Sequence, residues 1–79
     1  MRVLLTGAFG NIGANATRSL IEQGHSVRLF DVRTPRAARA ADALGGKVEV
    51  VWGDIRDAGA VRAAVADRDA VAHLAAIIP

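Results

Sequence analysis

Three glycines that follow a short apolar run near the start of the chain constrain its fold more than any other feature. The run is Val3 to Leu5, and Gly7, Gly10 and Gly13 come after it at even spacing. This pattern predicts a buried strand that turns sharply into a helix, because glycine permits tight turns and close approach of the backbone to a ligand. The free N–H groups and the dipole of such a helix start favour an anion. We therefore interpret the stretch as a loop that binds a phosphate or pyrophosphate.

The rest of the chain alternates helical and strand patterns. Helices are predicted at 12–23, 36–44 and 58–66, and further strands at 25–31, 47–52 and 70–75. Thr34 and Asp57 are expected to cap the second and third helices, and Gly24 to end the first. Because every crossover uses a helix, the sheet should be parallel. We predict an α/β fold, a partial Rossmann fold with four strands in the order 3-2-1-4 and three helices, two on one face and one on the other.

Length, charge and composition exclude several classes of protein. A chain of 79 residues forms one small domain, which buries only roughly 60% of its unfolded surface. It has no cysteine, so disulfides and thiolate metal sites are excluded, and its two histidines do not suggest a metal site. The net charge is +2 with acidic and basic residues interleaved, which argues against nucleic-acid binding. The longest apolar stretch is too short for a membrane span, and we expect a cytoplasmic protein.

Asp31 ends the second predicted strand, about 20 positions after the glycines. An acidic residue at that place accepts hydrogen bonds from the ribose hydroxyls in dinucleotide sites, and its charge repels the extra phosphate of NADP. NAD is therefore the expected cofactor and NADP the less favoured one. Two alternatives stay open. Asp31 is alternatively a solvated turn residue, and Arg33 either meets the NADP phosphate or is a solvated loop arginine.

Two further candidates fall at the same predicted sheet edge. Asp54 follows the third strand and can accept a hydrogen bond from the amino group of adenine, or else it is a turn or capping residue. Leu74, Ala75 and Ala76 close the fourth strand, where small side chains let a cofactor lie against the backbone. Ordinary core packing is the alternative for these three residues.

Together these motifs resemble the N-terminal half of the extended short-chain dehydrogenase/reductase family, the NAD-dependent epimerase/dehydratase group. The resemblance is carried by four stretches, Thr6 to Gly13, Asp31, Gly53 to Asp57 and Asp69 to Ala76. It implies a Rossmann domain that binds NAD and hydride transfer with a sugar-like carbinol, such as a nucleotide-sugar. The cofactor-binding residues that it implies are Gly7, Phe9, Gly10, Asn11, Ile12, Gly13, Asp31, Val32, Arg33, Asp54, Ile55, Leu74, Ala75 and Ala76.

The chain departs from the family where catalysis is concerned. The family uses a Tyr as base with a Lys four residues later, whereas this sequence has no tyrosine and its single lysine is Lys47. We therefore expect residues 1–79 to be a truncated dinucleotide-binding domain that lacks catalytic residues and the substrate domain. Two alternatives stay open, a non-catalytic Rossmann protein that senses NAD(P) and a fragment that self-associates through an exposed fourth-strand edge and an uncovered sheet face.

Overall fold

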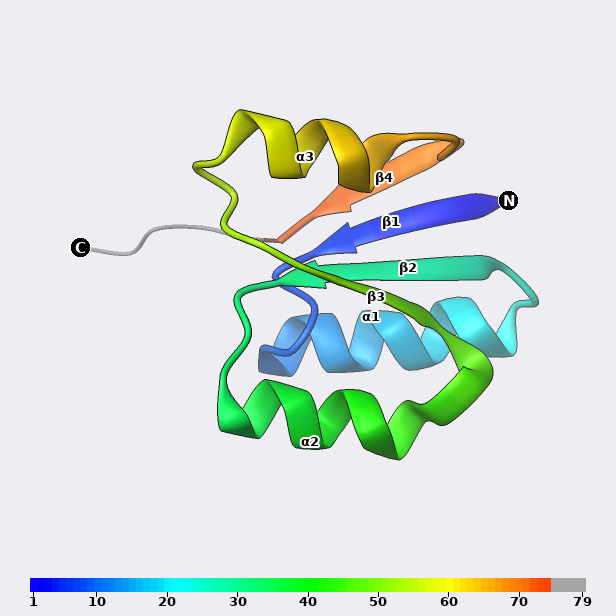
Figure 1. Cartoon of the computed structure of the whole chain (residues 1–79). Coiled ribbons are helices and arrows are strands. Elements are labelled where there is room, and N and C mark those ends of the chain that lie inside the picture. The colour runs from blue at the N-terminus through cyan, green and yellow to red at the C-terminus, as the bar shows by residue number, and fades with distance from the viewer. Residues whose placement is uncertain (75–79) are drawn as a thin grey trace.

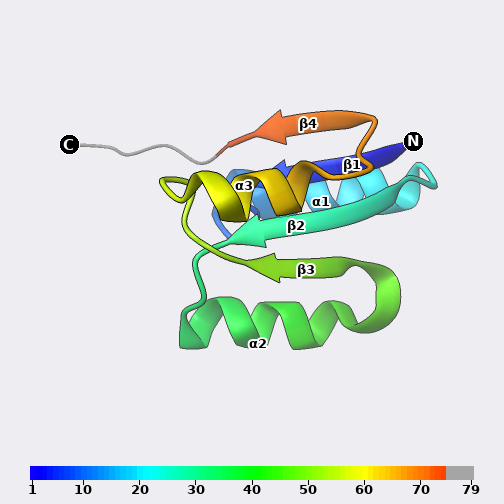
Figure 2. The same cartoon turned by 45° about the horizontal axis from the view of Figure 1, so that its top comes forward.

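Four parallel strands form the centre of the computed structural model, which describes residues 1–74. The strands are β1 (Arg2–Thr6), β2 (Ser26–Asp31), β3 (Glu49–Trp52) and β4 (Ala70–His73). They lie in the order β3-β2-β1-β4, as Figure 2 shows. The predicted fold class and strand order are confirmed.

Three α-helices cover the two faces of this sheet. They are α1 (Asn11–Glu22), α2 (Pro35–Leu44) and α3 (Ala58–Val65), and a short 3-10 turn, η1 (Gly45–Lys47), follows α2. Figure 1 shows α1 and α2 on one side of the sheet and α3 on the other. This arrangement agrees with the prediction from right-handed crossovers.

Local signals explain where the helices begin and end. The hydroxyl of Thr34 accepts the N–H of Ala37 at 3.0 Å, and the Asp57 carboxylate accepts the N–H of Gly59 at 3.0 Å, so both predicted caps are confirmed. Gly24, which follows the C-cap residue Gln23 of α1, has a φ of 85°, which favours glycine. The predicted start of β3 was two residues early, because the chain makes the turn η1 before it extends at Glu49.

The sheet core divides into two apolar clusters because successive strand side chains point to opposite faces. Leu5, Val27 and Leu29 are buried under α1 and α2, whereas Leu4 and Phe30 are buried under α3 with Ala64. Val71 of β4 pairs in register with Leu4 but is 51% exposed. On the face of the sheet that α3 covers, the part formed by β4 is therefore left open.

Arg28 anchors the C-terminal end of α3 to the sheet. Its Nε donates to the Glu49 carboxylate at 2.8 Å, and its Nη1 donates to the carbonyls of Ala64 and Ala66 at 2.8 and 2.9 Å. A cation at a helix C-terminus satisfies carbonyls that lack helical partners. The side chain thus ties β2 and β3 to the end of α3, and it fixes the helix whose other end carries the loop after β3.

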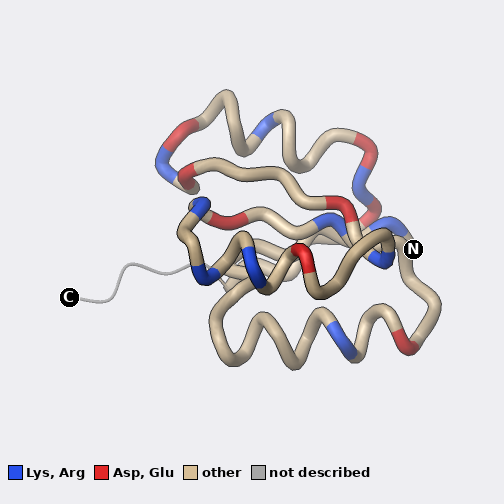
Figure 3. Tube along the Cα trace, turned by 60° about the horizontal axis from the view of Figure 1, so that its bottom comes forward, with Lys and Arg blue, Asp and Glu red and all other residues tan. Residues whose placement is uncertain are grey.

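Charged residues are distributed rather than gathered on one face. Figure 3 shows acidic and basic positions interspersed along most of the trace. Among the helices of the described residues, none has the length and apolar character that crossing a bilayer requires.

Candidate functional site

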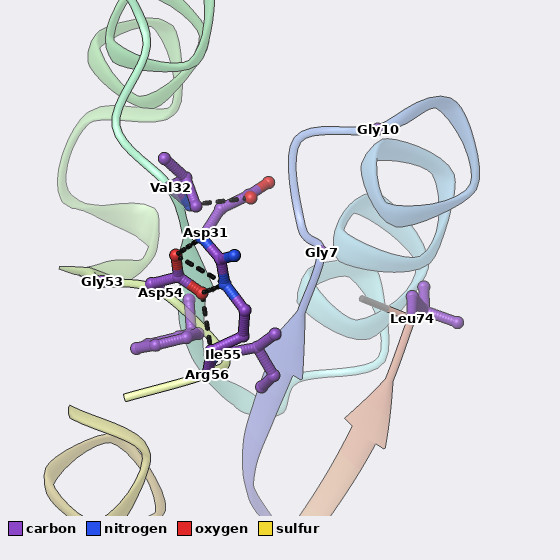
Figure 4. Close-up of a pocket in the computed structure, with 10 residues that line it drawn as sticks. Gly7, Gly10, Asp31, Val32, Gly53, Asp54, Ile55, Arg56 and Leu74 are labelled. Atoms are coloured by element: carbon purple, nitrogen blue, oxygen red, sulfur yellow. Dashed lines mark hydrogen bonds and ion pairs between the residues drawn. The ribbon is translucent and has the colours of Figure 1, made fainter. Parts of the chain in front are cut away.

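A cleft of about 460 Å³ opens at the carboxyl ends of the strands (Figure 4). Open parallel sheets bind ligands at this edge, and the volume lies within the range of small-molecule sites. The glycine loop, the ends of β2, β3 and β4 and the loop after β3 all contribute to it. Its lining residues are Gly7, Gly10, Phe30, Asp31, Val32, Gly53, Asp54, Ile55, Arg56 and Leu74.

The glycine loop has the backbone geometry that the sequence pattern requires. Gly7 adopts a φ of 65°, and its N–H donates to the carbonyl of Phe30 at 3.0 Å. Gly13 is buried at the start of α1, where a Cβ would lie 2.5 Å from the Gly7 carbonyl oxygen. Only glycine therefore lets α1 approach the loop so closely.

The start of α1 differs from the starts of α2 and α3. Gly10 is its N-cap residue, and no side chain in the described part of the chain caps it. The N–H groups in the first turn of a helix have no partner within that helix, and the helix dipole adds positive potential there. This end of α1, beside the cleft, has the donors that a phosphate group needs.

Asp31 connects the end of β2 to the glycine loop. Its Oδ2 accepts the N–H of Phe9 at 3.0 Å, and its Oδ1 accepts the N–H of Val32 at 2.8 Å. Figure 4 shows the carboxylate pointing toward the loop. A carboxylate has about four acceptor positions, so Asp31 keeps capacity for the hydroxyls of a ribose while it holds the loop.

Asp54 is paired with Arg56 in the loop after β3. Its Oδ1 accepts the backbone N–H of Arg56 at 2.9 Å, and its Oδ2 accepts Nη2 of the guanidinium at 2.7 Å. These hydrogen bonds to Arg56 lower the pKa of Asp54 to about 2. The carboxylate is therefore ionised throughout the physiological pH range.

Thr6 and His73 hold the ends of β1 and β4 together. The Thr6 hydroxyl and Nδ1 of His73 are hydrogen-bonded at 2.7 Å. The N–H of Leu74 donates to the same hydroxyl at 3.1 Å. These bonds place Leu74 at the wall of the cleft.

Of the fourteen predicted site residues, seven line this cleft: Gly7, Gly10, Asp31, Val32, Asp54, Ile55 and Leu74. Gly13 acts instead in helix packing, as described above. The ring of Phe9 stacks on that of Trp52 with 5.4 Å between the ring centroids, and the backbone N–H of Phe9 donates to Asp31.

Three predicted residues lie at the surface and do not line the cleft, and two lie outside the described residues. Asn11, Ile12 and Arg33 are exposed, with Ile12 at 73%. Ala75 and Ala76 are the two for which no position is described. The side chains of the three exposed residues therefore contribute nothing to the cleft walls.

Three lining residues had no predicted role in binding. Phe30 was assigned only to the second strand, and Gly53 and Arg56 only to a motif of the resemblance. A Cβ on Gly53 would lie 2.9 Å from the Phe30 ring, so the pair requires a glycine there. The one sequence signal for Arg56 was its spacing from Asp54, because a basic side chain two residues after an aspartate can fold back onto the carboxylate. In residues 1–74 no cluster of three or more metal-ligating side chains occurs.

The strand order, the glycine turn and the cleft at the strand ends define a partial Rossmann fold of the extended short-chain dehydrogenase/reductase class. A family profile described as the NAD dependent epimerase/dehydratase family matches residues 3–79. The chain belongs to this family.

Relatives and solved structures agree with this membership. A 3 beta-hydroxysteroid dehydrogenase/Delta 5-->4-isomerase of Mycobacterium tuberculosis is 47% identical over 77 residues, which cover 98% of this chain and 20% of that protein. A UDP-glucose-4-epimerase from Stenotrophomonas maltophila, solved with bound NAD, has a TM-score of 0.79 at 34% identity and covers 100% of this chain and 25% of its own.

A third similar protein is a serine dehydrogenase, solved in a closed form with NADP+. Its TM-score is 0.69 at 34% identity, over 85% of this chain and 27% of its own. The present chain therefore spans between 20% and 27% of the length of these proteins.

Proposed function

We propose that residues 1–79 are the NAD-binding portion of an epimerase, dehydratase or dehydrogenase that acts on a nucleotide-sugar or a related carbinol. The observation that carries the proposal is the Asp31 carboxylate, which is bonded to the glycine loop and lines the cleft with Asp54. Bound NAD supplies the hydride acceptor for such a reaction. The pyrophosphate is assigned to the first turn of α1, the adenosine ribose to Asp31 and the adenine to Asp54 and Ile55.

The 79 residues are expected to bind NAD without turning over a substrate. They contain no tyrosine, and Lys47 lies in η1, which does not line the cleft. Hydride transfer from a carbinol needs a base that takes the hydroxyl proton. In this proposal the base, and most contacts with the substrate, come from residues beyond this stretch.

Titration with NAD tests the binding function directly. Trp52 stacks on Phe9, whose N–H is held by Asp31, so a dinucleotide at Asp31 should change the fluorescence of Trp52. We expect a saturable change with a Kd from high micromolar to millimolar, because a part of the cofactor contacts lies outside the chain. NADP should bind more weakly, because its extra phosphate meets Asp31. A flat signal together with no heat of binding by calorimetry would refute the proposal.

A second candidate function is self-association, with a second copy of the chain as the partner. One edge of β4 pairs with β1, and within residues 1–74 no strand pairs with the other edge. Beside that open edge the apolar side chains of Val71 and Leu74 are 51% and 39% exposed. Open strand edges with apolar neighbours pair readily with another chain.

Sedimentation velocity tests this candidate. The chain should form dimers as its concentration approaches the millimolar range, and Val71→Lys should shift it to monomers because a lysine opposes pairing at an edge. Arg62→Lys, at an exposed position of α3, serves as the control, since it changes the surface without changing charge. A monomer at every concentration counts against the candidate.

A further inference from the structure

Arg56 makes several hydrogen bonds to the Asp54 carboxylate at the wall of the cleft. Three N–H groups of Arg56 donate to it, the backbone N–H, Nε and Nη2, at distances from 2.7 to 3.2 Å. Both side chains remain open to solvent, with the Arg56 side chain 75% and the Asp54 side chain 39% exposed. Exposed ion pairs contribute little to stability, so this geometry calls for another explanation.

Arg56 fills the acceptor positions of the Asp54 carboxylate unequally. A carboxylate offers about four lone-pair positions, two on each oxygen. On Oδ1 both are used, by the Arg56 backbone N–H at 2.9 Å and by Nε at 3.0 Å. On Oδ2, Nη2 takes one at 2.7 Å, and only the longer Nε branch at 3.2 Å approaches the other. Nε is shared between the two oxygens and its bond to Oδ2 is the longest of the four, so this Oδ2 position is the one that an N–H of a ligand can take over.

We propose that Arg56 is a positioning residue that fixes the Asp54 carboxylate so that one Oδ2 position accepts the exocyclic amino group of adenine. The inference rests on the NAD-binding function proposed above. Figure 4 shows Arg56 folded back onto Asp54 at the wall of the cleft. Hypoxanthine has an oxygen where adenine has its exocyclic amino group, and this oxygen would face the fixed Asp54 carboxylate. The Asp54–Arg56 pair therefore selects for adenine over hypoxanthine.

The charges around Asp54 are few. Of the residues that line the cleft, only Asp31 at the end of β2, Asp54 and Arg56 carry a charge, and the glycine loop and Leu74 contribute none. Arg56 holds the pKa of Asp54 at about 2, chiefly through its side-chain hydrogen bond. Without Arg56 the pKa should rise toward its usual value, so the acceptor is then lost as the pH falls toward 4.

The test compares two ligands on two proteins. NAD and nicotinamide hypoxanthine dinucleotide, which has an oxygen in place of the 6-amino group, are titrated into the wild-type chain and into Arg56→Met. The wild type should prefer NAD by about tenfold, as expected for a hydrogen bond to a charged acceptor, and Arg56→Met should reduce this preference to about threefold or less. Arg62→Met, which removes an equal charge from an exposed position of α3, should keep the full preference.

A pH series adds a readout that a merely structural role would not move. Between pH 6 and pH 4, NAD affinity of Arg56→Met should fall more steeply than that of the wild type, and Arg56→Lys should lie between them because it keeps the charge but not the planar fork. Because Asp31 is present in all three proteins, the differences between their pH profiles report the protonation of Asp54. Circular dichroism checks that each variant is folded.

The possible failures are distinguishable. If the wild type binds neither ligand, the proposed function fails. If it binds NAD but Arg56→Met keeps the same preference and the same pH profile, Arg56 has no positioning role and the inference alone is overturned.

Discussion

Replacing Gly13 by alanine should destabilise the fold by about 3 kcal/mol, because the added methyl group has no space. Its Cβ would lie 2.5 Å from the carbonyl oxygen of Gly7 and 2.6 Å from that of Ala8. Both contacts are with backbone, which cannot swing aside as a flexible side chain does. The total stability of a 79-residue domain is roughly 4–12 kcal/mol, so the loss is a large part of it.

Gly10→Ala is the matched control in the same loop. A Cβ there would lie 3.7 Å from the Gly7 carbonyl oxygen, an ordinary contact, and the φ of Gly10 is −78°, which any residue adopts. Its cost should stay below about 1 kcal/mol, the usual cost of alanine at a helix N-cap. Urea unfolding followed by circular dichroism measures both variants. Equal losses would mean that the close approach of α1 to the loop does not depend on Gly13.

Replacing Asp31 by asparagine should weaken NAD binding about 10- to 100-fold, because hydrogen bonds to a charged acceptor contribute roughly 1.5–3 kcal/mol. The substitution also affects the protein without cofactor. An amide has only one oxygen, so its NH2 group must face the N–H of either Phe9 or Val32, donor against donor. The substitution should therefore weaken the hold of this side chain on the Phe9 N–H, whereas the bond from the Gly7 N–H to the Phe30 carbonyl remains.

Two measurements separate these effects. Calorimetry gives the affinity, and hydrogen exchange of the Phe9 amide should become faster in Asp31→Asn even without NAD. Asp42→Asn removes the same charge from the exposed surface of α2 and should change neither quantity. An Asp31→Asn variant that binds NAD within about twofold of the wild type would exclude the ribose contact.

Much of this fold could be predicted because its signals are local. Alternating helix and strand patterns indicated the order of the elements, and Thr34 and Asp57 marked helix starts by their capping chemistry. The strand order followed from the crossovers, and Asp31 and Asp54 then fell at one edge. Such inferences need only periodicity, capping and chain direction.

The parts that were not predicted depend on contacts between distant segments or on side-chain conformation. The stack of Phe9 on Trp52 joins the glycine loop to β3, and no local sequence pattern predicts this contact. The pairing of Arg56 with Asp54 depends on the turn after β3 and on the rotamer of a long side chain. Whether a residue in the glycine loop faces the cleft or the solvent is likewise set by the three-dimensional path, as exposed Ile12 shows.

The hydrogen bond between Thr6 and His73 joins residues that are 67 positions apart in the chain. Bringing such distant segments together carries a loop-closure cost in entropy, which the rest of the fold has to offset. On the proposed NAD-binding function, a dinucleotide that contacts both the glycine loop and Leu74 would favour the closed loop over the open one. At a free ligand concentration of 100 times Kd, this linkage is worth about 2.7 kcal/mol. In a domain this small, a bound cofactor would thus stabilise the folded state as well as occupy the cleft.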